Sequence, residues 1–191
     1  SIHSRLPTVK RMVVKVGTYL LRGRDGGLNH EVMDNLVRQI AVLHERGIEV
    51  ILVTSGAVGA GAEAMGMDNP PDDLNVRQAL AAIGQSRLMH FYKGKFLQYG
   101  LRVAQILLTR DALDQRKRYL NVRNTFDTLL KWGVIPIVNE NDTVATEELE
   151  LRFGDNDQLS AMIAGKMGAQ LLIILTVVNG LFDRPPSDPE A

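Results

Sequence analysis

Short apolar runs alternate with amphipathic stretches along the chain. Runs rich in Val, Ile and Leu predict strands at RMVVKVG (11–17), IEVILVTS (48–55), LRVAQILLT (101–109), VIPIV (134–138) and QLLIILT (170–176). Helical patterns separate them at 30–47, 77–100, 117–133 and 156–168. Because a helix between two strands connects them as a parallel crossover, the pattern predicts an α/β fold, a three-layer α/β/α sandwich with a mainly parallel central sheet.

Individual residues refine these elements. The first helix presents one apolar stripe formed by Val32, Leu36, Ile40 and Leu43. It is expected to stop at Gly47, as helices commonly do. Gly84 and Gly94 lie inside the segment 77–100, where glycine disfavours a continuous helix. Pro136 is expected near a sheet edge or a strand end, because proline cannot donate a hydrogen bond to a strand ladder.

Composition narrows the class of protein. The 191 residues are 45% hydrophobic and 23% charged, which suits one globular domain with a substantial core. Twenty-two basic residues balance twenty-two acidic ones, so we expect no nucleic-acid or membrane partner. The lack of cysteine excludes disulfides, thiolate catalysis and cysteine zinc sites. No apolar run reaches the roughly 18 residues of a membrane span, and the first residues lack a signal-peptide core, which predicts a cytoplasmic protein.

Polar residues follow the carboxyl end of each predicted strand: Lys15 with Gly17 and Thr18, Ser55 with Gly56, Thr109, residues 139–142, and Thr176. In open parallel sheets, ligands bind in the crevice beyond these ends, where successive loops converge. The sequence therefore predicts one site built from five separated segments. For any single cluster, ordinary loop polarity is an equally good explanation.

The glycine-rich stretch VTSGAVGAG (53–61) predicts that something approaches the main chain closely, because glycine has no Cβ. We expect the approaching group to belong to a ligand. Ser55 and Gly56 would offer hydroxyl and N–H donors to its carboxylate or phosphoryl group. The match of 59–64 to G-x-G-x-x-A is weak, since no second strand ends in an acidic residue about 20 residues later. Neither a Walker P-loop nor a G-x-S-x-G elbow is present.

Charged residues supply the remaining candidates. Lys15 lies between two valines, where its ammonium needs either an anion or an escape to solvent at a sheet edge. Asp155 is best read as a helix cap, but Asn156 and Asp157 follow it directly, and Asp142 comes from another loop. Carboxylates beside a lysine could hold a substrate ammonium, orient the lysine or ligate magnesium. The four histidines show no metal-binding spacing, so no protein metal site is expected.

Seven segments together resemble the glutamate 5-kinase family of the amino-acid kinase superfamily. In chain order they are VVKVGT, ILVTSGAVGAG, AAIGQSRL, QILLTRDAL, RYLNVRNT, IPIVNENDTV and FGDNDQLSA, within Met12 to Phe182. The resemblance implies an enzyme that transfers the γ-phosphoryl group of ATP, with Mg²⁺, to the side-chain carboxylate of L-glutamate. This reaction is the first step of proline biosynthesis. A glutamyl phosphate reductase as partner and a homo-oligomer, dimer or tetramer, are further implications.

The resemblance also assigns residues by motif. To glutamate binding it assigns Ser55, Gly56, Asp142 and Asn156. To the nucleotide it assigns Lys15, Gly17, Thr176 and Val177. Lys15 would contact the ATP phosphates, and Asp157 would organise the catalytic lysines. We expect Asp142 to hold the α-ammonium of the substrate.

Two departures from the family pattern qualify these assignments. Val177 stands where the family usually has an aspartate that accepts a hydrogen bond. Residues 1–191 are expected to stop short of a glycine-rich segment that gives relatives a second phosphate-binding lysine, and to contain no C-terminal RNA-binding-like domain. We therefore expect residues 1–191 to form the N-terminal, substrate-binding portion of the kinase domain, which binds glutamate without efficient transfer. A noncatalytic glutamate-binding or regulatory module, or a sister kinase acting on another carboxylate, is the alternative.

Overall fold

The structure is a computed structural model that describes residues 9–23, 27–144 and 156–177. Its five strands are β1 (Arg11–Val16), β2 (Glu49–Thr54), β3 (Arg102–Leu108), β4 (Val134–Glu140) and β5 (Leu171–Leu175). They form one sheet in the order β3-β4-β2-β1-β5, and every neighbouring pair is parallel. The predicted parallel sheet is confirmed, and all five carboxyl ends lie along the same rim.

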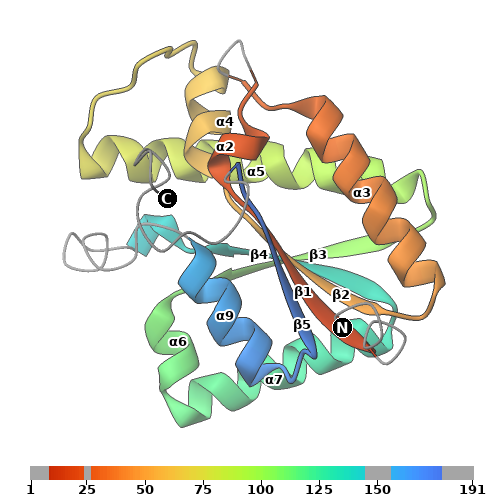
Figure 1. The fold of residues 1–191 in the computed structure, drawn as a ribbon. Helices are drawn as coiled ribbons and strands as arrows, with labels where there is room; N and C mark the ends of the chain where they lie inside the picture. The colour runs from red at the N-terminus through yellow and green to blue at the C-terminus, as the bar shows by residue number, and fades with distance from the viewer. Residues whose placement is uncertain (1–8, 24–26, 145–155, 178–191) are drawn as a thin grey trace, which may run out of the picture.

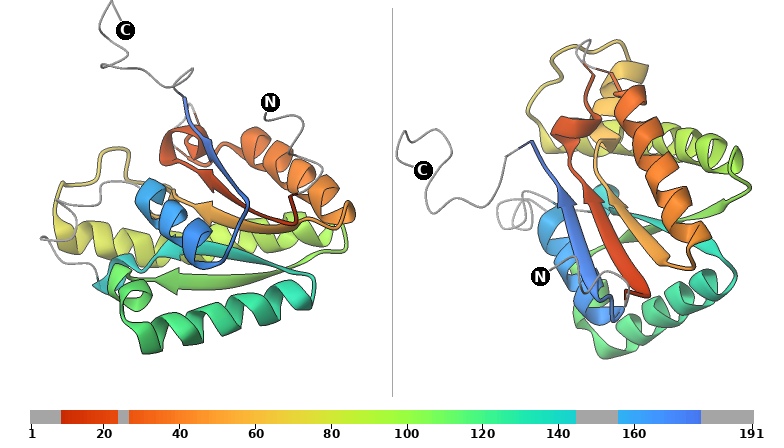
Figure 2. Two further views of the ribbon diagram at one scale, coloured as in Figure 1. Left: turned by 60° about the horizontal axis from the view of Figure 1, so that its bottom comes forward. Right: turned by 45° about the vertical axis from the view of Figure 1, so that its right-hand side comes forward.

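Helices cover both faces of the sheet (Figures 1 and 2). On one face lie α3 (His30–Glu45) and α5 (Leu74–Leu97), with the short α2 (Thr18–Leu21) and α4 (Ala57–Ala64) at their rim end. On the other lie α6 (Arg110–Asp114), α7 (Arg116–Lys131) and α9 (Asn156–Lys166). A 3₁₀ turn, η2 (Asp142–Val144), follows β4. The three-layer sandwich predicted from the sequence is therefore confirmed.

The alternation of side chains along β1 divides the core in two. Met12, Val14 and Val16 pack among α3 and α5, whereas Val13 packs among α6, α7 and α9. Since strand side chains alternate with a period of two, Lys15 shares the face of Val13 and points into the layer that contains α9. The register of this strand therefore decides which helix can supply a partner for the lysine.

The expectations for helices α3 and α5 need correction. The buried face of α3 includes Leu36 and Ile40, as predicted, but it also uses Met33, Val37 and Ala41, whereas Val32 and Leu43 are only partly buried. Helix α5 runs without a break through Gly84 and Gly94. It begins at Leu74, because Asp73 caps it by accepting a hydrogen bond from Val76 N at 3.0 Å.

Pro136 lies on β4, an interior strand, so it does not lie at a sheet edge. It is the third residue of the strand, and pairing with β2 begins one residue later, at Ile137. The missing N–H therefore precedes the ladder that joins β4 to β2. This placement explains how the strand tolerates proline inside the sheet.

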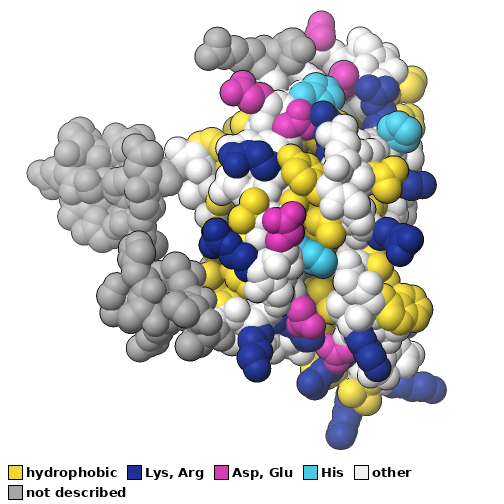
Figure 3. All heavy atoms as spheres, turned by 90° about the vertical axis from the view of Figure 1, so that its right-hand side faces the viewer, with side chains coloured by type: hydrophobic (Ala, Val, Ile, Leu, Met, Phe, Trp, Pro, Cys, Tyr) yellow, Lys and Arg dark blue, Asp and Glu magenta, His cyan; other side chains and the backbone are white. Residues whose placement is uncertain are grey.

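On the face that carries α3, basic and acidic side chains are interspersed (Figure 3), in keeping with the equal numbers of the two in the sequence. Within the described parts of the chain, every helix is too short or too polar to cross a lipid bilayer.

Candidate functional site

Asn156 ties three elements together at the carboxyl rim of the sheet. Its side-chain amide Nδ2 donates to Thr54 O at 2.8 Å, to Ser55 Oγ at 2.9 Å and to Asn139 Oδ1 at 2.9 Å. These acceptors belong to the ends of β2 and β4, and Asn156 is the first residue of α9. Only 8% of Asn156 is exposed. Two predicted site residues, Ser55 and Asn156, are thus in direct contact although 101 positions separate them.

Lys15 reaches the same rim from β1 and pairs with Asp157. The lysine is 2% exposed, and its Nζ lies 2.7 Å from Asp157 Oδ1. The aspartate side chain is 46% exposed, so the pair sits at the boundary between core and solvent. A buried ammonium needs such an anion, because desolvation without a partner costs several kcal/mol. The interpretation of Lys15 as a snorkelling edge lysine is therefore wrong, since β1 lies between β2 and β5.

Gly17 leaves the space beside the lysine amine free of a side chain. A Cβ built at Gly17 would lie 3.1 Å from Lys15 Nζ, closer than most real Cβ contacts, and 3.9 Å from Leu175 O. Any side chain at this position would press on the ammonium or on the end of β5. The glycine therefore leaves an approach to the positive charge, which an anionic ligand could use.

The turn after β2 requires glycine for a different reason. Gly56 has φ 97° and ψ 2°, a left-handed conformation that residues with a Cβ rarely adopt. It directly precedes α4, whose first-turn N–H groups lack acceptors within the helix. Ser55 N donates to Val16 O at 3.2 Å, which fixes the turn against the end of β1. The arrangement can bind an anion with the helix N–H groups and the Ser55 hydroxyl.

Gly61, in the same stretch, serves helix packing rather than ligand approach. A Cβ at Gly61 would lie 1.9 Å from Leu80 O, and one at Gly84 would lie 1.8 Å from Ala57 O. The main chains of α4 and α5 therefore touch, and only glycine fits between them. The expectation that a ligand requires the bare backbone is wrong for Gly61, where the close neighbour is α5.

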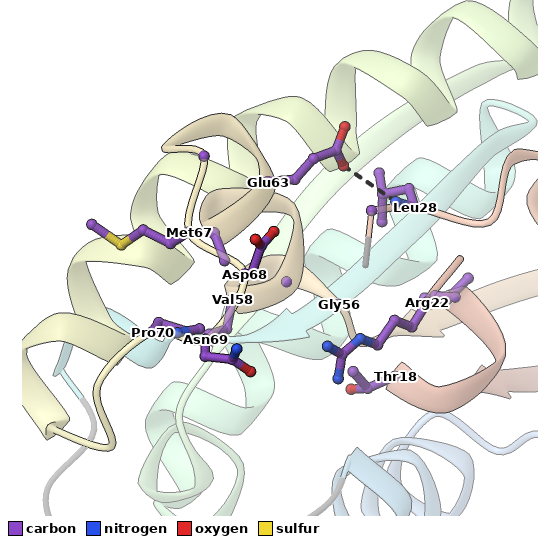
Figure 4. A pocket seen from close by; sticks show the side chains of 15 residues that line it. Thr18, Arg22, Leu28, Gly56, Val58, Glu63, Met67, Asp68, Asn69 and Pro70 are labelled. Carbon is purple, nitrogen blue, oxygen red and sulfur yellow. Dashed lines mark hydrogen bonds between the residues drawn. The ribbon is translucent and has the colours of Figure 1, made fainter. Parts of the chain in front are cut away.

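A cavity of about 550 Å³ opens beside this turn (Figure 4). Thr18 and Arg22 line it from the end of α2, Gly56 from the turn, and Asp68 and Asn69 from the loop after α4. The guanidinium of Arg22 extends toward Asn69. With one cation, two carboxylates (Glu63 and Asp68) and an amide around bare main chain, the cavity suits a small polar, charged molecule.

Asp142 lies in a second cavity, of about 260 Å³, between α5, β3 and the end of β4. Gln85, Gln105 and Glu140 line it together with Asp142. Asn139 joins this cavity to the rim, because its Nδ2 donates to Gln85 Oε1 at 3.0 Å while its Oδ1 accepts from Asn156. The cavity that Asp142 lines is thus linked to Ser55 through a chain of buried amides.

Other expected residues do not join this network. The hydroxyl of Thr109 donates to Asp111, whose second carboxylate oxygen accepts from Arg118, so this cluster holds α6 against α7. The hydrogen bond from Thr109 is the main reason that the pKa of Asp111 lies below its usual value. Thr176 and Val177 are exposed just beyond β5. Asp155, expected to be a cap, lies outside the described residues.

Sequence reasoning missed three contributors to the rim. Asn139 was grouped with its polar neighbours, but nothing distinguished it as the acceptor of Asn156. Gln85 follows Gly84 in a helix and carries no local signal of burial. Tyr92 is fully buried and its hydroxyl lies 3.0 Å from Thr54 Oγ1, and burial raises the pKa of this tyrosine. Of these three residues, only Asn139 carries a sequence signal, because it is a polar residue near the end of an apolar strand.

The described residues contain no cluster of three or more His, Asp or Glu side chains suited to hold a metal ion.

Residues 10–191 match the amino acid kinase family. The chain belongs to that family, since the match covers nearly all of it. The parallel sheet with its polar carboxyl rim is thus the scaffold of an amino acid kinase.

Similar curated proteins share one name. A glutamate 5-kinase of Caldanaerobacter subterraneus subsp. tengcongensis is 55% identical over 176 residues, which cover 92% of this chain and 47% of that protein. One from Citrifermentans bemidjiense is 51% identical over 187 residues, 97% of this chain and 50% of that protein. One from the methanogen Methanococcoides burtonii is 49% identical over 177 residues. The chain spans about half the length of these relatives.

Proposed function

We propose that this chain supplies the glutamate-binding and part of the phosphoryl-transfer machinery of a glutamate 5-kinase. The reaction would convert L-glutamate and MgATP to L-glutamyl 5-phosphate and ADP, the first step of proline biosynthesis. The observation that carries the proposal is the contact of Lys15 with Asp157 at the same rim as the Ser55–Asn156 pair. A cationic group thus faces the place where two anions would have to meet. The identity with glutamate 5-kinases supports the choice of substrate.

To catalyse this phosphoryl transfer, the protein mainly has to position the two substrates and neutralise their negative charge. The side-chain carboxylate of glutamate is already ionised at neutral pH, so it can attack the γ-phosphorus without a general base. A bond forms between this oxygen and phosphorus, and the bond from phosphorus to the ADP oxygen breaks. Phosphoryl transfer of this kind is catalysed chiefly by alignment and by neutralising the phosphate oxygens.

The glutamate side of the site would use Ser55, Gly56, Asn156 and Asp142. Because Ser55 Oγ accepts from Asn156 Nδ2, its own hydroxyl hydrogen is free to point at the reacting carboxylate. The left-handed Gly56 directs the first turn of α4 toward the same place. Asp142 would hold the α-ammonium group in the neighbouring cavity.

The nucleotide side would use Lys15, held by Asp157 and left open by Gly17. Magnesium would arrive with ATP as part of the substrate, bound to its phosphate oxygens. Thr176 and Val177, at the end of the neighbouring strand β5, would contact the nucleotide. A valine can do so only through van der Waals contact and main-chain groups, because its side chain accepts no hydrogen bond.

Several wider features belong to the same proposal. Residues 1–191 would form the N-terminal, substrate-binding portion of an amino-acid kinase domain. The acyl phosphate is reactive toward water, so a reductase that consumes it promptly is the expected partner. We also propose a homo-oligomer, dimer or tetramer, working in the cytoplasm.

Binding and transfer are tested separately on the purified chain. Calorimetry measures the affinity for L-glutamate, N-acetylglutamate, aspartate and carbamate, and coupled ADP release with MgATP measures transfer. L-glutamate is expected to bind most tightly and to raise ADP release measurably but weakly above background, because transfer by residues 1–191 alone is expected to be inefficient. Preference for another substrate would assign the chain to a sister kinase, and glutamate binding without ADP release would favour a binding module.

The role of Asp142 has its own test. Asp142→Asn removes the negative charge and keeps the shape, so it should raise the glutamate KM far more than the ATP KM. Equal effects on both constants would contradict an ammonium-binding role.

A further inference from the structure

One buried amide group in the rim network has no hydrogen-bond partner. Gln85 is 7% exposed, and its Nε2 finds no acceptor within the described structure. Leaving a buried donor unsatisfied typically costs ~1–3 kcal/mol, so such an atom calls for an explanation. The explanation depends on whether the unpartnered atom of Gln85 is truly the nitrogen, because the oxygen and nitrogen of a side-chain amide are easily assigned the wrong way round.

Two main-chain groups fix the orientation of the whole amide chain. Thr54 O can only accept, so the atom of Asn156 that faces it must be Nδ2. Glu140 N can only donate, so the atom of Asn139 that it contacts at 2.9 Å must be Oδ1. Asn139 therefore presents Nδ2 to Gln85, and the atom of Gln85 that accepts at 3.0 Å must be Oε1. The unpartnered atom is necessarily the NH₂ donor.

The cavity beside Gln85 is suited to supply the missing acceptor. Gln85 lines the cavity of about 260 Å³ that also contains Asp142, from the loop after β4. Under the proposed function, Asp142 holds the α-ammonium of glutamate. The α-carboxylate is bonded to the same carbon as that ammonium, so it must lie in the same small cavity. A carboxylate oxygen is also the acceptor that forms the strongest hydrogen bond with an amide N–H.

We propose that Gln85 is a specificity-determining residue whose Nε2 donates a hydrogen bond to the α-carboxylate of glutamate. The inference rests on the proposed function and names the contact that selects an α-amino acid. Through Asn139 and Asn156 the same amide chain reaches Ser55, which would hold the reacting carboxylate at the other end of the substrate. Both ends of glutamate would thus be positioned by one continuous network.

The test variant is Gln85→Glu. It keeps an oxygen to accept from Asn139 and replaces only the NH₂ group, placing a negative charge where the α-carboxylate should lie. The matched control is Gln105→Glu, which adds the same charge to the same cavity from an exposed glutamine on β3. Calorimetry on the 191-residue chain compares three ligands: L-glutamate, glutarate, which lacks the ammonium, and 4-aminobutyrate, which lacks the α-carboxylate.

Gln85→Glu should lower the affinities for L-glutamate and glutarate by about 10- to 100-fold, the range for a lost hydrogen bond to a charged group. The affinity for 4-aminobutyrate should stay within about threefold of the wild type, and Gln105→Glu should change all three affinities little. Equal weakening of all three ligands, or the same pattern in Gln105→Glu, would show a structural or long-range charge effect and overturn the inference. Unchanged glutamate affinity in Gln85→Glu would overturn it while leaving the proposed function intact. A wild-type chain that binds no L-glutamate would overturn the proposed function and this inference together.

Discussion

At the scale of single residues, the charge of Lys15 is the most consequential feature of the rim. It is almost fully buried beside Asp157, and Gly17 places no side chain against its amine. Lys15→Met keeps a flexible side chain only one atom shorter and removes the ammonium group, with its charge and its N–H donors. Turnover should fall by about 100-fold or more, the usual loss when one group that stabilises a transition state is removed. Asp157 is half exposed and can be hydrated in the variant, so the fold should persist.

The control for this variant is Lys93→Met, which removes an exposed lysine from α5. Steady-state ADP release gives the rates, and circular dichroism checks the fold. A Lys15→Met chain that is folded and retains more than a tenth of wild-type turnover would remove Lys15 from the reaction.

The hydroxyl of Ser55 makes a second residue-scale prediction. In Ser55→Ala, Asn156 keeps its acceptors Thr54 O and Asn139 Oδ1, so the free energy of unfolding should change by no more than ~1 kcal/mol. The substrate loses one donor, and kcat/KM for glutamate should fall about 10- to 100-fold. Ser86→Ala is the matched control, because Ser86 lines the Asp142 cavity but donates its hydroxyl to Ile83 O at 2.9 Å. Similar losses in both variants would argue against a specific role.

At the scale of elements, the contact of α4 with α5 determines where the turn at Gly56 lies. Gly84→Ala would place a Cβ 1.8 Å from Ala57 O, so the helices must separate. We expect a loss of ~1–3 kcal/mol in the free energy of unfolding, the usual cost of overpacking, and weaker glutamate binding because the start of α4 moves.

Gly94→Ala is a matched control on the same helix. A Cβ there meets no atom within 4 Å, so alanine should stabilise the chain by up to ~1 kcal/mol through helix propensity alone. Urea denaturation of the two variants measures both changes. If both substitutions stabilise the protein, the close packing of α4 on α5 is wrong.

At the scale of the whole molecule, the sequence predicts the layers well and the site only in part. Strand and helix positions depend on local periodicity, which predicts the five strands and the four longest helices but not the short helices α2, α4 and α6. Gly84 and Gly94 look alike in the sequence, yet only the first touches another main chain. Gln85 has no local signature, because its importance comes from Asn139, which lies 54 positions away. Contacts of this kind depend on strand order and helix placement, which periodicity does not specify.

The final prediction concerns the stability of the whole molecule. Asn156, at the start of α9, donates hydrogen bonds to the ends of both β2 and β4, so a ligand that bridges these segments should stabilise the entire fold. At 100 times its Kd, L-glutamate would add ~2.7 kcal/mol, which for a chain of this size raises Tm by about 5–10 °C. L-glutamine should raise Tm much less, because its side chain lacks the reacting carboxylate. Asn156→Ala removes the hydrogen bonds that join these segments, so it should abolish the rise in Tm caused by L-glutamate. If Asn156→Ala shows the full shift in thermal scans, or if glutamine equals glutamate in the wild type, the ligand does not bind at this junction.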